Sequence, residues 1–78
     1  MKPTFEEMKK LLIEAANIDV EITPDSVLKT DLGIDSIDAV EMMLVLEERF
    51  GIKIEMKEMD TMMTVTDVVD FVSKKLED

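Results

Sequence analysis

Apolar residues recur at helical spacing in three stretches of this chain, and this periodicity limits the possible fold more than any other feature of the sequence. In the first stretch, apolar positions lie three and four residues apart and charged residues fill most of the others. Thr4 and Glu7 can form a capping box before it. The apolar positions are Phe5, Met8, Leu12, Ala15 and Ala16. We therefore predict an amphipathic helix over residues 5–17.

The second stretch ends at Gly51, a residue that suits the left-handed position just beyond a helix C-terminus. It begins at residue 35 or 36, where Asp35 or Ser36 can cap the helix, and acids at 35 and 38 suit the positive N-terminus. One sector of about 100° collects apolar residues, which is the width of a buried stripe. The members of this sector are Ala39, Met42, Met43, Leu46 and Phe50.

The third stretch follows Thr64 and Asp67, which repeat the capping pattern. Its apolar residues at 65, 68, 69, 72 and 76 follow a helical period, whereas the adjacent pair Val68 and Val69 breaks the alternation of a strand. Residues 56–60 have the propensities for one or two additional helical turns. Three main helices and a short one are therefore expected.

Residues 18–35 lack periodicity and carry turn signals at 23–26 and 31–33. A connection this long needs anchoring, so we predict that its apolar side chains pack inward and that residues 24–28 form a short helical turn. The anchoring side chains are Ile22, Val27, Leu28 and Leu32. The expected fold is all-α: a small four-helix bundle with a short third helix and a long loop between helices one and two.

The size of the chain predicts a single domain over residues 1–78. Such a domain buries only about 60% of the surface of its unfolded form, so its stability should be modest. No apolar run approaches the ~20 residues of a membrane span, and the N-terminal residues show no secretory signal. We therefore expect a cytoplasmic protein that does not span a membrane.

Neither cysteine nor histidine occurs in the chain, which removes disulfides, the common zinc sites and the usual base of nucleophilic catalysis. A calcium loop fails on spacing, because a loop that starts at Asp31 has Ser36 and Met42 where glycine and glutamate are needed. A loop that starts at Asp25 fails in the same way. We expect no catalytic residue and no specific metal site, while a weak surface cation site among the acids stays open.

The charge of the chain is strongly acidic, with 19 acidic against 9 basic residues and a formal net charge of −10. Such a chain repels nucleic-acid phosphates and anionic membrane surfaces. Its partners should instead be proteins with basic patches, and nucleic acid is not expected among them.

Residues 31–38 (DLGIDSID) place Ser36 at the start of the second helix, after a glycine turn and between two carboxylates. From these residues alone an N-cap is the simplest interpretation, worth roughly 1 kcal/mol to the helix. Together with Glu41 and residues 46–52, however, the segment resembles the modification motif and second helix of acyl carrier proteins, and the resemblance extends over essentially the whole chain. It implies that Ser36 carries a covalent 4′-phosphopantetheine arm and that Asp35 is the acid before the modified serine.

Two departures from the family pattern leave the pathway open between fatty acid and polyketide-type biosynthesis. Ile37 stands where the family's triplet has leucine, and residues 54–57 read Ile-Glu-Met-Lys where fatty-acid carriers commonly read Ile-Pro-Asp-Glu. Asp35 argues against the carriers of peptide synthetases, which more often have histidine there.

The missing residue types agree with a carrier that is not itself an enzyme. A chain without cysteine cannot form a thioester, and one without histidine cannot readily activate Ser36. We expect a monomer. The resemblance implies that a phosphopantetheinyl transferase modifies this chain and that the chain serves acyl-transferring synthase enzymes. The phosphodiester adds negative charge where a helix N-terminus tolerates it.

The outer side of the second helix mixes apolar and acidic side chains and is predicted to dock partner enzymes. Carboxylates steer basic partners at long range, and apolar residues supply short-range burial. The predicted partner residues are Ile37, Asp38, Val40, Glu41, Leu44, Glu47 and Glu48. In the alternative, Ile37 and Leu44 are covered by the long loop or by the third helix.

Two further alternatives stay open at this point. The eight methionines suit either a deformable core that opens for an acyl chain or ordinary gap filling. The chain could also be an unmodified acidic adaptor with the same fold, which presents its second helix to a basic partner.

Overall fold

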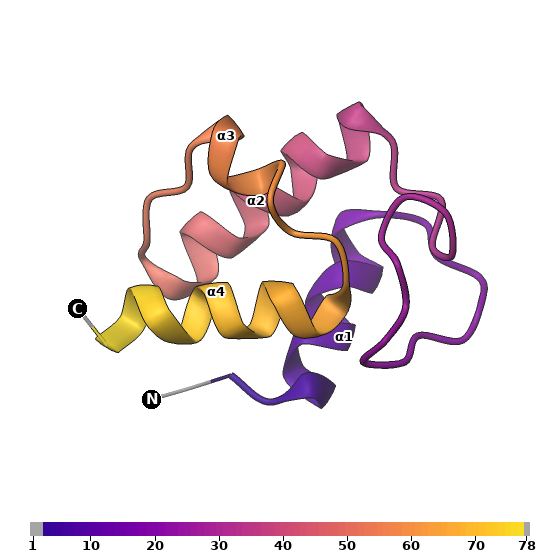
Figure 1. The fold of residues 1–78 in the computed structure, drawn as a ribbon, viewed down its shortest axis with the longest axis horizontal. Coiled ribbons are helices and arrows are strands. Elements are labelled where there is room, and N and C mark those ends of the chain that lie inside the picture. Colours follow the sequence, from indigo (N-terminus) through magenta and orange to yellow (C-terminus); the bar gives the residue numbers. More distant parts are fainter. Residues whose placement is uncertain (1–2, 78) are drawn as a thin grey trace.

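The computed structural model of the protein describes residues 3–77, and four helices account for most of them (Figure 1). In chain order they are α1 (Phe5–Ala15), α2 (Ser36–Phe50), α3 (Met56–Met59) and α4 (Val65–Glu77). The described range contains no strand, although Val27 and Thr64 form an antiparallel bridge. α1 packs against both α2 and α4, and α2 also contacts α4. The predicted all-α fold with three main helices and a short third one is confirmed.

α1 begins with the predicted capping box and ends earlier than predicted. The Thr4 hydroxyl accepts from the Glu7 amide at 3.2 Å, and the Glu7 carboxylate accepts from the Thr4 amide at 2.9 Å. The helix ends at Ala15 because Ala16 adopts an extended conformation with φ −144° and ψ 149°. The Ala16 amide still donates to the Leu12 carbonyl, so the last turn is closed.

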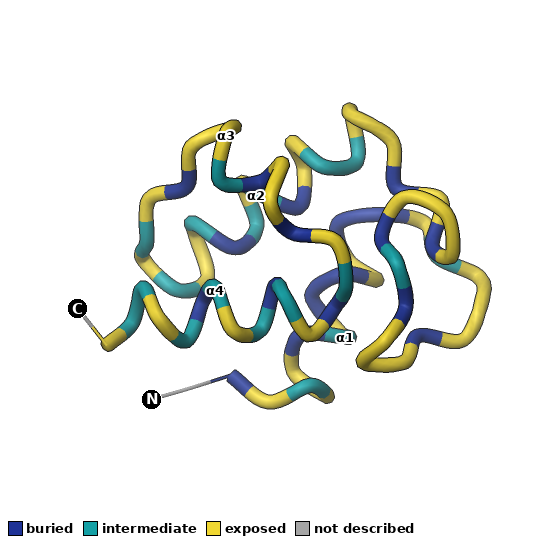
Figure 2. Tube along the Cα trace, in the orientation of Figure 1, coloured by how far each residue is buried: buried dark blue, intermediate teal, exposed yellow. Residues whose placement is uncertain are grey.

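The core lies where α1, α2 and α4 meet, and the long loop adds to it (Figure 2). The loop contributes four buried apolar side chains: Ile22, Leu28, Leu32 and Ile34. Val27, which was predicted to point inward, is half-buried. Inward packing of the loop is thus confirmed at three of the four predicted positions, and Ile34 is an addition.

Residues 24–28 do not form the predicted helical turn. A turn closed by the Ser26 amide and the Thr23 carbonyl is followed directly by the bridge to Thr64. There the Leu28 amide donates to the Met63 carbonyl at 2.9 Å. The backbone groups of this segment pair across the molecule, which a purely local pattern cannot indicate.

The same loop also caps α4. The carbonyls of Ser26 and Pro24 accept from the amides of Val65 and Thr66, at 3.1 and 3.0 Å. These amides belong to the first turn of α4, where N–H groups have no partner inside the helix. The Thr66 hydroxyl donates to the Pro24 carbonyl as well, at 2.8 Å. The loop before α2 and the start of α4 are therefore one hydrogen-bonded structure.

Thr64 and Asp67 form the predicted cap of α4. The Asp67 carboxylate accepts from the amides of Met63 and Thr64, at 2.9 and 3.0 Å, and the Thr64 hydroxyl accepts from the Asp67 amide. The hydrogen bonds from the Met63 and Thr64 amides lower the pKa of Asp67 below its ordinary value, because they stabilise the charged carboxylate.

We expect Asp67→Ala to lower the free energy of unfolding by about 1 kcal/mol at neutral pH, as loss of a helix cap does. The lowered pKa of Asp67 means that the carboxylate stabilises the fold above its unfolded pKa, near 3.8. That contribution is lost as the pH falls through the lower, folded value. Urea unfolding of both proteins at pH 7 and in acid should show the difference shrinking in acid. Asp70→Ala, an exposed change on the same helix, is the control, and an equal loss in that variant would refute the cap.

Candidate functional site

Ser36 is the first residue of α2, and its side chain is exposed. The N-cap is Asp35, whose carboxylate accepts from the Asp38 amide at 2.9 Å. The Ser36 hydroxyl makes no hydrogen bond within residues 3–77. The interpretation of Ser36 as the helix cap is therefore wrong: Asp35 caps the helix and the serine hydroxyl stays available for chemistry.

The backbone that leads to Ser36 is held in place from both sides. Gly33 adopts φ +68°, a left-handed conformation that favours glycine even though a Cβ there would meet no atom within 4 Å. The Asp31 carboxylate accepts from the Val27 amide at 2.8 Å, and the Ile34 amide donates to the Leu28 carbonyl at 2.9 Å. The approach to Ser36 is consequently an ordered turn.

A cavity of about 370 Å³ opens beside Ser36, between the loop, α2 and α3. Five methionines line it together with other apolar side chains: Met42, Met56, Met59, Met62 and Met63. Met56 and Met63 are exposed, whereas the other three are buried. The number of methionines was noted from the sequence, but their common location around a cavity was not predicted. The three-residue spacing of Met56, Met59 and Met62 was the available signal, because it places these side chains at neighbouring positions.

The outer side of α2 carries the predicted mixture of apolar and acidic side chains. Ile37 is 75% exposed, Leu44 51% and Val40 37%. Glu41 and Glu48 are also exposed. The alternative in which the loop or α3 covers Ile37 and Leu44 is therefore wrong for this chain.

Asp38 and Glu47, at the borders of this side, are half-buried. One oxygen of the Glu47 carboxylate accepts from the Ile54 amide at 2.8 Å, which fixes the segment after α2. The structure thus gives Glu47 a structural task and removes it from the freely presented acids. The group that Glu47 binds is a backbone amide, so the pattern of side chains in the sequence could not have revealed this hydrogen bond.

The described residues offer no cluster of three or more carboxylates, histidines or cysteines able to hold a metal ion. None of the helices between residues 3 and 77 has the length and apolar character needed to cross a bilayer. The chemistry at the head of α2 thus consists of a free serine hydroxyl, a capping carboxylate and an adjacent apolar cavity.

Comparison with known proteins agrees with this arrangement. Residues 6–72 match the family model described as the phosphopantetheine attachment site. An acyl carrier protein of Helicobacter pylori is 38% identical over 69 residues, which is 87% of this chain and 88% of that protein. The chain therefore belongs to the phosphopantetheine attachment family and, within it, to the acyl carrier proteins.

Solved structures support the same conclusion. An acyl carrier protein from Thermotoga maritima matches with a TM-score of 0.71 and 32% identity, over 90% of this chain and 91% of that one. A candidate acyl carrier protein from Mycobacterium tuberculosis matches with a TM-score of 0.77 and 28% identity, over 95% and 97%. Proteins of this family are carriers rather than catalysts, and their prosthetic group is phosphopantetheine, as the sequence predicted.

Proposed function

We propose that Ser36 is the residue to which the phosphopantetheine arm is attached. The observation that carries this proposal is the free hydroxyl of Ser36 on the first residue of α2, where Asp35 already caps the helix. A serine without a structural task, at an exposed helix start, is available to a modifying enzyme. The arm supplies the thiol that this cysteine-free chain lacks.

The residues around Ser36 fit such a group. The Ser36 oxygen forms the phosphodiester, and the first turn of α2 favours the negative charge of the phosphate. Asp35 keeps the helix start ordered through the Asp38 amide. The methionine-lined cavity adds an apolar space next to the attachment point, suited to part of the acyl cargo because thioether side chains adapt to irregular shapes.

The outer side of α2 is proposed to dock the partner enzymes. These are a phosphopantetheinyl transferase and the acyl-transferring enzymes of fatty acid or polyketide-type synthesis. Exposed Ile37, Val40 and Leu44 provide apolar contact close to Ser36, and Glu41 and Glu48 provide charge for basic surfaces. The chain acts as a monomer, since each copy carries the serine, the cavity and the docking side.

Intact-mass measurement after treatment with a phosphopantetheinyl transferase and coenzyme A tests the proposal. We expect one phosphopantetheine per chain, which peptide mapping places on Ser36. No increment would favour the alternative, an unmodified acidic adaptor that keeps the fold. An increment mapped to another hydroxyl would keep the carrier and move the site.

A further inference from the structure

α3 is a very short helix, and its position depends on contacts with the rest of the molecule. It has four residues, far fewer than an isolated helix needs for stability in water. Met59 is buried in the core, whereas Met56 and Lys57 are exposed. The placement of α3 therefore rests on Met59 and on whatever holds its remaining side chains.

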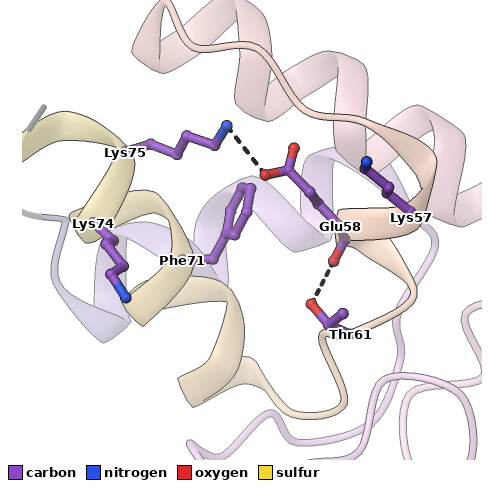
Figure 3. A pocket seen from close by; sticks show the side chains of 6 residues that line it. All are labelled: Lys57, Glu58, Thr61, Phe71, Lys74 and Lys75. Atoms are coloured by element: carbon purple, nitrogen blue, oxygen red, sulfur yellow. Dashed lines mark hydrogen bonds and ion pairs between the residues drawn. The ribbon is translucent and has the colours of Figure 1, made fainter.

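Glu58 holds α3 through both of its carboxylate oxygens. Oε1 accepts from the Glu55 amide at 2.9 Å and closes the N-terminus of α3. Oε2 pairs with Lys75 Nζ of α4 at 3.2 Å (Figure 3). The hydrogen bond from the Glu55 amide and the contact with Lys75 lower the pKa of Glu58, so this carboxylate is charged at neutral pH.

The pair between Glu58 and Lys75 is better shielded than two other ion pairs of the molecule. Its side chains are 28% and 33% exposed, against more than half for the pairs of Arg49 with Glu14 and of Lys57 with Glu55. Lys75 Nζ also lies 5.5 Å from the centre of the Phe71 ring, within the range of a cation–π contact. Partial shielding and the ring contact place the stabilising contribution of this pair in the upper part of the range for surface ion pairs.

α3 contributes to two different hollows. Met56 and Met59 line the cavity beside Ser36, and Lys57 and Glu58 line a groove against Phe71 and Lys75 of α4. The same four-residue helix thus forms one wall of the cavity and carries Glu58, which pairs with Lys75 of α4. A shift of α3 that moves Met56 and Met59 would therefore change the cavity.

We propose that Glu58 and Lys75 form a latch that fixes α3 against α4 and thereby sets how far the cavity beside Ser36 opens to the cargo. The part that concerns cargo rests on the proposed attachment at Ser36; the part that concerns α3 does not. Both residues are positioning residues, because neither lines the cavity.

Hydrogen exchange of the unmodified protein tests the latch directly. The variants are Glu58→Gln, which keeps an acceptor for the Glu55 amide, and Lys75→Met, which keeps apolar contact with Phe71. We expect the amides of residues 58–60, bonded within α3, to exchange roughly two- to fivefold faster, the change expected from loss of one such pair. The amides of α1 should be unchanged, and the double variant should exchange no faster than the faster single variant.

Lys74→Met is the matched control, because Lys74 lines the same groove without pairing to Glu58. Unchanged exchange in α3 of both test variants would overturn the latch, and so would equal acceleration in the Lys74 variant.

The cargo part is tested on protein loaded with a medium-chain acyl thioester. The rate of thioester cleavage by hydroxylamine should change roughly two- to fivefold in the Glu58 and Lys75 variants and stay constant in the Lys74 variant. Unchanged cleavage together with faster exchange in α3 would overturn the link to cargo. If neither the wild type nor any variant can be loaded with the acyl thioester, the proposed function of Ser36 is overturned. The exchange result on α3 would still stand.

Discussion

Ser36→Ala is expected to abolish attachment of phosphopantetheine completely while it leaves the fold intact. The hydroxyl is the atom that forms the phosphodiester, so its removal leaves no acceptor at this position. It also makes no hydrogen bond within residues 3–77, and Asp35 caps α2 in its place. We therefore expect the free energy of unfolding to change by less than about 0.5 kcal/mol, as for an unremarkable surface substitution.

Mass spectrometry after transferase treatment and urea unfolding measure the two effects. Ser73→Ala on α4 is the matched control for attachment and should be modified like the wild type. Asp35→Ala is the matched control for stability and should cost about 1 kcal/mol, because it removes the cap. A modified Ser36→Ala protein, or one that loses as much stability as Asp35→Ala, would contradict the assignment.

Charge reversal on the outer side of α2 is expected to slow association with the transferase. Glu41→Lys and Glu48→Lys remove exposed acids that attract a basic surface, and exposed charges act mainly on the encounter rate. At low salt we expect association to slow by roughly three- to tenfold, and the difference should shrink as salt screens the charges. Stopped-flow binding at two ionic strengths measures this dependence.

Leu44→Ala should affect the same complex in a different way. Leu44 is half-exposed and free to be buried by a partner, so its truncation should speed dissociation by on the order of tenfold and should do so at high salt as well. Glu6→Lys on α1 makes the same change in net charge away from α2 and is the control. If that variant slows association as much as Glu41→Lys does, the net charge explains the effect, and the proposal that partners dock on the outer side of α2 is wrong.

The helices could be predicted from the sequence because their signals are local. A capping residue and its partner lie three positions apart, and the buried stripe of α2 recurs within single turns. The caps at Thr4 and Thr64 and the left-handed Gly51 therefore appear in the structure where the sequence placed them. The choice between Asp35 and Ser36 as the cap of α2 could not be made this way, since both residue types suit that position.

The contacts that complete the site are not local, and the sequence did not reveal them. The bridge between Val27 and Thr64 and the bond from the Ile54 amide to Glu47 join segments through the backbone. The pair of Glu58 with Lys75 depends on how α3 lies against α4. Such contacts follow from the packing of helices already formed, and periodicity within one segment carries no information about them.

The hydrogen bonds between the loop and α4 have a consequence for how the molecule opens. The bonds of Thr66 with Pro24 connect residues 42 positions apart, and closing a loop of that length costs about 3 kcal/mol of chain entropy. Once this loop is closed, the carbonyls of Pro24 and Ser26 and the first amides of α4 all have hydrogen-bond partners. Unfolding of either segment leaves the other without its partners, so the two should open and close as one cooperative unit. The turn that presents Ser36 is then as persistent as the start of the C-terminal helix.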